Sequence, residues 1–260
     1  MTRQEVFTFY HEPGRRLVYV TLLLENQPGA LAAVTGVLGQ LKVNIVSGHF
    51  AARSGDRHGT IHLIADVDPK TTVAELEKRV RSVPEVAHVR TIESEGSLLI
   101  DPSFPIVNHS GARVLIWTAE PIARALANLR EELGSGGSVL VYDAGILFAQ
   151  AIWPVLQKVV GAATLPSRLG QVLQIYQATG WGRLERTDVD VERKRVSVHI
   201  AESFECRGQS GKGPYSQFLR GHLAGMFSVV FSVPLAEVDC REEACLAKGD
   251  PACEFTIVQR

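Results

Sequence analysis

Two hydrophobic patterns alternate along the first part of the chain. Runs rich in β-branched and apolar residues, typical of strands, occupy 16–24, 43–53, 60–68 and 86–94. Between them, 28–42 and 71–83 place apolar residues three and four positions apart, which is the spacing of an amphipathic helix. Thr71 and Thr72, shortly before Glu75, add the residue types that begin helices.

The order of these segments is strand, helix, strand, strand, helix, strand. This order predicts a ferredoxin-like βαββαβ domain at residues 1–95. Because both helices then lie on one face of the sheet, the other face needs a cover, and a partner subunit or domain is the usual solution. Residues 96–111 contain two prolines and no sustained periodicity, so we interpret them as a linker.

Residues 112–260 combine both patterns and predict a second domain of helices packed on an antiparallel sheet, so the fold class is α+β. Helical spacing occurs at 119–133, 146–160, 166–180 and 213–232. Strand patterns occur at 138–145, 182–190, 194–203, 235–249 and 252–258, with glycines at 134–137 interpreted as the end of the first helix.

Composition narrows the class of protein. The chain has 260 residues, of which 45% are hydrophobic, and a net charge of -1, so nothing favours direct nucleic-acid binding. The most apolar stretch, 144–163, contains Gln150, Pro154 and Lys158, and we interpret it as a buried helix rather than a membrane span. The amino terminus lacks the apolar core of a signal peptide, so we expect a cytoplasmic protein.

Three of the four cysteines lie close together near the carboxyl terminus. Cys240 and Glu242 are two positions apart on a predicted strand and therefore share a face. A Gly-Asp-Pro turn then brings Cys253 back toward Cys245, and Cys206 is the fourth cysteine. Thiolates with one carboxylate suit zinc. Buried inert thiols and a redox disulfide are the two alternatives.

The first domain resembles an ACT domain. The resemblance rests on the turn and helix start after the first strand and on Val43-Asn44-Ile45 at the start of the second. In that family these two segments often bind an amino acid between paired domains, which implies a homodimer. Pro28 and Gly29 would make a tight entry, with free helix amides facing a carboxylate. The candidate residues are Asn26, Gln27, Pro28, Gly29, Ala30, Leu31, Asn44 and Ile45.

The second domain resembles a 4-vinyl reductase domain, the fold of the sensor domains of aromatic-responsive activators. The resemblance rests on 219–228 and on the Glu-x-x-Cys-x-Ala-x-Gly-Asp-x-x-Cys pattern of 242–253. It implies a zinc held by Glu242, Cys245 and Cys253. The first ligand of the phenol-sensing members is a cysteine, but its position is Ser216 in this chain. Cys206 or Cys240 is therefore the candidate for the remaining ligand.

Six further residues are candidates to line an apolar cavity among the helices, although aromatic residues at helical spacing also occur in ordinary cores. They are Phe148, Trp153, Tyr176, Trp181, His222 and Phe227. The hydrolase elbow, the zinc-protease motif and the dinucleotide fingerprint are absent, so no reaction is indicated. We expect a regulatory protein that binds an amino acid, a hydrophobic or aromatic ligand, or both. The rival hypotheses are a tetrapyrrole-related vinyl reductase or carrier, and a ligand-free assembly module.

Overall fold

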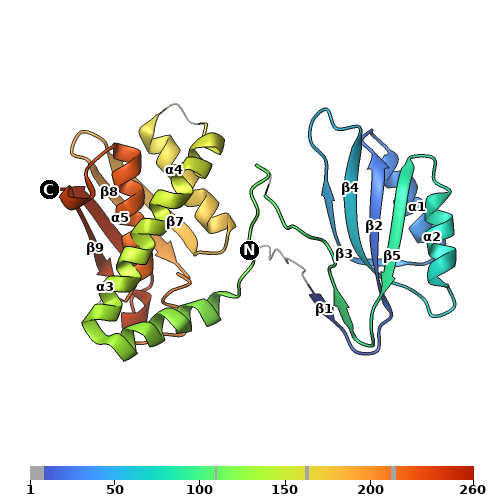
Figure 1. Ribbon diagram of the computed structural model, residues 1–260, viewed down its shortest axis with the longest axis horizontal. Coiled ribbons are helices and arrows are strands. Elements are labelled where there is room, and N and C mark those ends of the chain that lie inside the picture. The colour runs from blue at the N-terminus through green and yellow to red at the C-terminus, as the bar shows by residue number, and fades with distance from the viewer. Residues whose placement is uncertain (1–8, 109, 162–163, 212–214) are drawn as a thin grey trace. The chain divides into compact units, whose positions relative to one another are not determined.

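The computed structural model describes residues 9–108, 110–161, 164–211 and 215–260 (Figure 1). The prediction made for 96–111 includes His109, and that for 144–163 includes Ala162 and Ala163, which lie outside the described residues. The chain divides into two compact units, one ending at Phe104 and the other beginning at Pro105. Each unit is described separately below.

The first unit has the predicted ferredoxin-like order. Its elements are β2 (Leu17–Glu25), α1 (Ala30–Gln40), β3 (Asn44–Ala51), β4 (His58–Asp66), α2 (Val73–Arg81) and β5 (Val86–Glu93). The strands form one antiparallel sheet in the order β3-β4-β2-β5. The Thr72 hydroxyl caps α2 by accepting a hydrogen bond of 3.1 Å from the Glu75 amide, as the sequence indicates.

Alternation along the central strand sorts its residues between the two faces of the sheet. Val18, Val20, Leu22 and Leu24 are all buried and pack with the apolar sides of α1 and α2 in one core. Leu17 and Tyr19 point to the opposite face and are fully buried as well. The face without helices is therefore covered at this strand.

That cover comes from the chain itself. Two short strands, β1 (Phe9–His11) and β6 (Leu98–Ile100), pair antiparallel, and Leu99 packs with Leu17, Tyr19 and Ile64. The sequence pattern does not predict either strand, and β6 lies inside the stretch predicted to be a linker. Both strands are only three residues long, too short for a pattern to register.

The hydroxyl of Tyr19 fixes the segment that follows β6. It donates a hydrogen bond of 2.6 Å to Asp101 Oδ1 and lies 3.0 Å from Ser103 Oγ and 2.9 Å from His62 Nδ1. Burial, followed by the hydrogen bond to Asp101, raises the pKa of Tyr19, so the hydroxyl keeps its proton. The last residues of the first unit are thus tied to its sheet.

In the described residues, the second unit packs three helices with a four-stranded sheet. Its elements are α3 (Ala119–Val159), α4 (Leu165–Ala178), β7 (Arg183–Asp190), β8 (Arg195–Ala201), α5 (Gln217–Phe231), β9 (Val238–Ala244) and β10 (Cys253–Gln259), with short 3-10 turns at Leu235–Glu237 and Leu246–Lys248. The sheet is antiparallel in the order β7-β8-β10-β9. The α+β prediction is confirmed.

One predicted strand is wrong. Residues 138–145 belong to α3, which passes through the glycine-rich stretch with a kink at Gly134 (φ 59°, ψ -132°) and changes direction there (Figure 1). A short apolar run does not distinguish a strand from a buried helix. Here the buried residues Gly137, Val141, Gly145 and Ala149 recur every four positions, which gives α3 an apolar side to pack against α5.

Glycines allow α3 and α5 to approach closely. A Cβ atom on Gly145 would lie 2.1 Å from the Phe218 carbonyl oxygen, and one on Gly221 would lie 2.0 Å from the Tyr142 carbonyl oxygen. Both distances are far inside van der Waals contact, so neither position accommodates a side chain. This contact positions α5, whose amino-terminal end carries the residues of the candidate site.

A buried cysteine cluster and an aromatic cage

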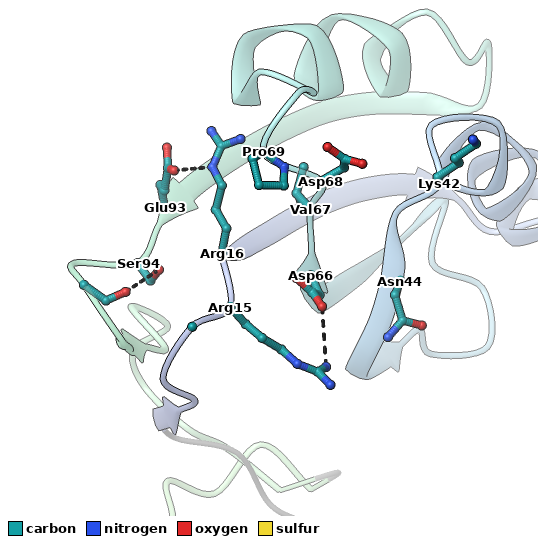
Figure 2. A pocket seen from close by; sticks show the side chains of 12 residues that line it. Arg15, Arg16, Lys42, Asn44, Asp66, Val67, Asp68, Pro69, Glu93 and Ser94 are labelled. Atoms are coloured by element: carbon teal, nitrogen blue, oxygen red, sulfur yellow. Dashed lines mark hydrogen bonds and ion pairs between the residues drawn. The ribbon is translucent and has the colours of Figure 1, made fainter.

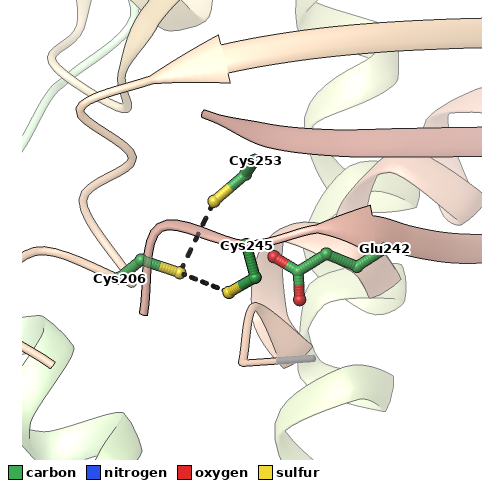
Figure 3. A group of neighbouring side chains, drawn as sticks. All are labelled: Cys206, Glu242, Cys245 and Cys253. Carbon is green, nitrogen blue, oxygen red and sulfur yellow. Dashed lines mark hydrogen bonds between the residues drawn. The ribbon is translucent and has the colours of Figure 1, made fainter. Parts of the chain in front are cut away.

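The first candidate site lies where the β9–β10 hairpin meets the start of α5. Cys206 follows β8, Glu242 is on β9, Cys245 follows β9, and Cys253 begins β10 (Figure 3). The turn between the strands is held by a hydrogen bond of 2.7 Å from the Cys245 amide to Asp250 Oδ2. The hairpin therefore returns Cys253 to Cys245, as the sequence spacing predicts.

The side chains of the cluster meet at bonding range for a metal. Cys206 Sγ lies 3.6 Å from Cys245 Sγ and 3.7 Å from Cys253 Sγ, and one donor atom from each of the four residues lies within 4.8 Å of the others. Sulfur atoms at two corners of a tetrahedral zinc site with Zn–S bonds of about 2.3 Å would be about 3.8 Å apart. All four cysteines of the chain are free, so these distances are not disulfide bonds. The donor set fits a metal ion.

Ser216 holds the carboxylate of the cluster. It precedes α5, its hydroxyl donates a hydrogen bond of 2.6 Å to Glu242 Oε1, and its amide donates one of 3.0 Å to Glu242 Oε2. Burial raises the pKa of Glu242, and these two hydrogen bonds oppose the rise. The Ser216 hydroxyl also lies 3.1 Å from Cys206 Sγ, so Cys206 stands beside the position where the family has a cysteine.

A second buried carboxylate occupies the same helix end. Glu205 Oε1 and Oε2 accept hydrogen bonds of 2.9 and 2.8 Å from the amides of Phe218 and Leu219. Burial raises the pKa of Glu205 to about 7, although these amides favour its charged form. Carboxylates at the amino-terminal end of a helix also interact favourably with its dipole. Glu205 therefore fixes Cys206 next to the start of α5.

Cys240 does not join the cluster. It pairs with Ile257 across the β9–β10 ladder, it is 6% exposed, and it packs in the apolar core of the unit. Burial raises the pKa of the Cys240 thiol, which keeps it neutral. Of the two cysteines that the sequence offered as the remaining ligand, the structure brings Cys206 to the other three residues and leaves Cys240 apart.

The second candidate site is a cage of aromatic rings around His222. The ring centroid of His222 lies 4.8 Å from those of Tyr176 and Trp181 and 5.6 Å from that of Phe148. Tyr176 and Trp181 stack on each other at 4.8 Å. These are four of the six aromatic candidates, and they come from α3, the end of α4 and α5.

The remaining members of the aromatic set are distributed differently. Phe227 stacks on Phe231 at 4.3 Å on the later part of α5, and Trp153 packs against the core from α3, so neither contributes a ring contact to the cage. Phe204 and Phe218 do contact Trp181, at 5.6 and 5.8 Å, and sequence reasoning missed them. The position of Phe218 one helical turn before His222 was the available signal.

The cage contains polar atoms without partners. His222 is 0% exposed, and in the described part of the chain neither of its ring nitrogens has a hydrogen-bond partner of good geometry. The Tyr176 hydroxyl is buried without a partner there too. Burial lowers the pKa of His222 to about 3, against a weaker opposing effect of the Gly145 backbone, so the ring is neutral and offers one donor and one acceptor. Unpaired buried polar groups are costly and point to a missing partner.

The space beside the cage is small. A cavity of about 10 Å³ is lined by Tyr176, Trp181, Leu219, Leu223 and neighbouring residues. That volume accepts about one water molecule and no aromatic ring. A ring-sized ligand would therefore enter only if the surrounding side chains or α4 moved.

The two segments of the first unit that resemble an amino-acid site do not meet. Asn26 to Leu31 follow β2 at the end where Glu25 pairs with His58, whereas Asn44 and Ile45 lie where Asn44 pairs with Asp66. β4 separates these ends by eight residue steps, about 26 Å. Within one chain the two segments lie at opposite ends of the sheet.

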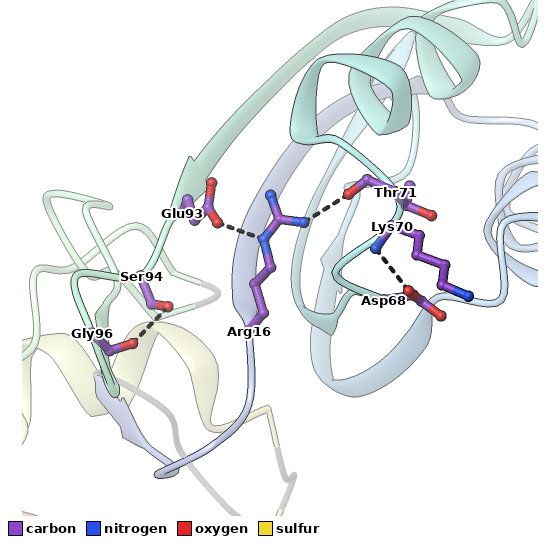
Figure 4. Close-up of polar contacts among 7 residues, drawn as sticks. All are labelled: Arg16, Asp68, Lys70, Thr71, Glu93, Ser94 and Gly96. Atoms are coloured by element: carbon purple, nitrogen blue, oxygen red, sulfur yellow. Dashed lines mark hydrogen bonds and ion pairs between the residues drawn. The ribbon is translucent and has the colours of Figure 1, made fainter.

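A hollow of about 590 Å³ opens at the Asn44 end of this sheet (Figure 2). Three basic residues (Arg15, Arg16, Lys42) and three acidic residues (Asp66, Asp68, Glu93) line it. Arg15 pairs with Asp66 at 3.4 Å, and Arg16 bonds both Glu93 and the Thr71 carbonyl (Figure 4). The balance of charges makes this wall zwitterionic and well hydrated.

Comparison with known families explains both halves. An ACT domain model matches residues 18–85, and a 4-vinyl reductase domain model matches residues 196–259. The chain carries an ACT domain and a 4-vinyl reductase domain. The second match includes Ser216, His222 and the four members of the cysteine cluster, whereas Phe148, Tyr176 and Trp181 precede it.

Two solved structures are similar to parts of the chain. The phenol-responsive sensory domain of the transcription activator PoxR, crystallised with phenol, is 15% identical with a TM-score of 0.50 over 63% of this chain and 81% of that chain. The ACT domain of GTP pyrophosphokinase from Chlorobium tepidum is 24% identical, with a TM-score of 0.26, over 29% of this chain and 96% of that one. A comparison with curated proteins gives no match.

Proposed function

We propose that the chain is a small-molecule sensor whose 4-vinyl reductase domain binds an aromatic ligand that carries a hydroxyl group. The observation that supports this most is His222, fully buried in an aromatic cage with both ring nitrogens unpartnered in the described structure. An aromatic ring would extend the stacking of Tyr176 and Trp181. Its hydroxyl would donate to one nitrogen of His222 or accept from the other. The phenol bound to the PoxR domain is a ligand of this class.

The small cavity gives the sensor its mechanism. Since about 10 Å³ holds no ring, the ligand would bind a form in which the cage has opened. A ligand that binds the open form better shifts the population toward it. The opening involves α3, α4 and α5 together, because each contributes a ring to the cage. Binding would therefore change the packing of the whole helical layer.

Matched ligands test this proposal. Phenol and toluene have nearly the same shape, and only phenol can bond to His222. Titration followed by tryptophan fluorescence should give an affinity for phenol at least about tenfold higher than for toluene. In the His222→Phe variant this preference should disappear while toluene still binds. Equal affinities for the two ligands in the wild-type protein, or no binding of either, would contradict the proposal.

We further propose that the cysteine cluster holds one zinc ion through Cys206, Glu242, Cys245 and Cys253. Support comes from the sulfur spacing of 3.6 and 3.7 Å and from the buried donor set. Such a site would tie the β9–β10 hairpin to the segment after β8 and stabilise the fold on which the cage is built. The role we assign to this zinc is structural.

Elemental analysis with three serine variants tests the metal. Purified wild-type protein should contain about one zinc per chain. Cys206→Ser and Cys245→Ser should lose it, because each removes a thiolate. Cys240→Ser is the matched control, another buried cysteine of the same hairpin, and it should keep the zinc. Metal loss in the Cys240 variant alone, or wild-type protein without metal after preparation in zinc-containing medium, would contradict this assignment.

The ACT domain adds an amino-acid site in our proposal. Because Asn26–Leu31 and Asn44 lie at opposite ends of one sheet, a site that uses both requires two antiparallel copies of the domain side by side. A calorimetric screen of amino acids should then show binding that is weakened by both Asn26→Ala and Asn44→Ala. Binding that only the Asn44 variant weakens would instead favour the zwitterionic hollow of Figure 2.

A further inference from the structure

The outward side of α3 is unusually apolar. Between Gly134 and Gln157 the chain contains a single charged residue, Asp143. Helical spacing places ten exposed residues on one side of this part of α3. We call them the α3 stripe: Gly136, Val139, Leu140, Asp143, Ala144, Leu147, Phe148, Gln150, Ala151 and Pro154.

The large side chains of the stripe are strongly exposed. Val139, Leu140 and Leu147 are 58%, 61% and 64% exposed, and Phe148 is 42% exposed. A helix that packs one side on a protein core normally presents charged and polar residues on the other. α3 packs its small residues against α5 and presents leucines outward instead. Contiguous apolar surface of this kind marks an interaction site.

We infer that the α3 stripe docks on the same stripe of a second copy of the chain, with the two helices antiparallel. The evidence is the order of residues about the 143–144 peptide bond. Leu140 and Leu147 are equidistant from it, and so are Gly136 and Ala151. A two-fold axis through this point brings leucine level with leucine and small residue level with small residue. The stripe is thus complementary to itself.

A lipid surface is a poorer occupant of the stripe. α3 passes a length and composition test for a membrane span, with a mean hydropathy of 1.7, which is weak evidence by itself. Its other side, however, is committed to α5 through Gly145, so the helix is not free to insert. Helices that lie on membranes carry lysine and arginine beside their apolar face. The stripe carries neither, and its one charge is the negative Asp143 at its centre.

The area of the stripe sets the strength of the contact. Its four large side chains, 42–64% exposed, hold roughly 130–270 Å² of apolar surface per copy, at about 60–120 Å² for a fully exposed side chain. Stable interfaces bury about 800 Å² per partner. The stripe therefore predicts a reversible dimer with a dissociation constant on the order of micromolar or weaker.

Phe148 connects the stripe to the aromatic cage. Its ring lies 5.6 Å from that of His222 and 5.9 Å from that of Trp181, while 42% of its surface is exposed on the stripe. A ligand that opens the cage would therefore displace a residue of the dimer contact. This coupling, unlike the dimer itself, rests on the proposed ligand site.

Sedimentation velocity of the full-length protein tests the dimer. Between about 5 and 500 µM the wild-type protein should pass from monomer toward dimer. Leu140→Asp should raise the dissociation constant at least about tenfold, because it places two carboxylates in the contact. Val191→Asp, at an exposed valine of the β7–β8 turn, is the matched control and should change nothing. Asp143→Asn should tighten the dimer, because the two-fold axis places both Asp143 side chains on the same edge.

A cross-link keeps the test decisive if a variant fails to fold. Ala144→Cys places a thiol next to the two-fold axis, and all four native cysteines are buried. A short bismaleimide should join two chains of this variant, but not two chains of Glu192→Cys. A wild-type monomer at every concentration, or a dimer unaffected by Leu140→Asp, would overturn the inference. So would Ala144→Cys that cross-links no better than its control, or vesicle binding that Leu140→Asp abolishes.

Discussion

The neutral state of His222 gives the sharpest prediction for the 4-vinyl reductase domain. Burial lowers the pKa of His222 from 6.5 to about 3. The unfolded chain therefore binds a proton near pH 6.5 that the folded chain does not bind until the pH falls much further. Stability from this residue is complete above pH 6.5 and is lost as the pH falls from 6.5 toward 3.

The magnitude follows from the two pKa values. Between about pH 7.5 and pH 5.0 the linkage relation gives a loss of about 2 kcal/mol in the free energy of unfolding. The His222→Gln variant, which cannot titrate, should lack this component. Glu205, with a pKa raised by burial to about 7, acts in the opposite direction over the same range. Since both proteins contain Glu205, its effect cancels when the pH dependence of the variant is subtracted.

Urea unfolding monitored by tryptophan fluorescence is the assay. All three tryptophans, Trp117, Trp153 and Trp181, belong to the second unit, so the signal reports that unit alone. The wild-type protein should lose about 2 kcal/mol more than His222→Gln between the two pH values. Parallel pH dependence in the two proteins would refute the reasoning, because it would mean that His222 titrates normally in the folded state.

Three further substitutions test the packing. Gly221→Ala should cost more than about 3 kcal/mol in the second unit, whereas Gly170→Ala, an open helical position, should be neutral or stabilising in the same urea assay. Tyr19→Phe should destabilise the ACT unit by about 1–3 kcal/mol, measured by hydrogen exchange in β2, and Tyr10→Phe should not. Thr72→Ala should cost about 1 kcal/mol by the same exchange measurement, and an unchanged protection pattern would contradict the capping role.

Local patterns predict most of the ACT unit because its strands are long enough to alternate and its helices are amphipathic. Residues such as Val18 and Val20 on one strand, or Leu76 and Val80 on one helix, indicate their buried side directly. The β1–β6 ribbon is not predictable in this way. Its strands have three residues each, and Leu99 is buried only because Tyr19 and Ile64 lie on the sheet below it.

The candidate sites are partly predictable from the sequence. The spacing of Glu242, Cys245 and Cys253 brings them together on one hairpin, because a turn has a fixed reach. Whether Cys206 or Cys240 completes the cluster is not predictable from spacing. That choice depends on the register of β9 against β10, which includes an irregularity at 254–255, and on the path of the chain after β8. Long-range geometry of this kind leaves no periodic signal.

The strand wrongly predicted at 138–145 has the same origin. Val139, Leu140 and Val141 have strand propensity, but Gly137, Val141 and Gly145 are spaced to pack against α5. Tertiary packing therefore decides the local structure. The same misassignment hid the α3 stripe, since Leu140 and Leu147 share a face only on a helix.

Nitrogen NMR of histidine side chains tests the central claim most directly. Among the eight histidines of the chain, one imidazole, absent from the spectrum of His222→Gln, should remain neutral at about pH 5. Adding phenol should shift its ring nitrogens more than those of the other histidines, because the ligand hydroxyl bonds to that ring. If His222 is charged at that pH, or if phenol leaves its nitrogens unmoved, the 4-vinyl reductase domain does not bind aromatic ligands in this cage.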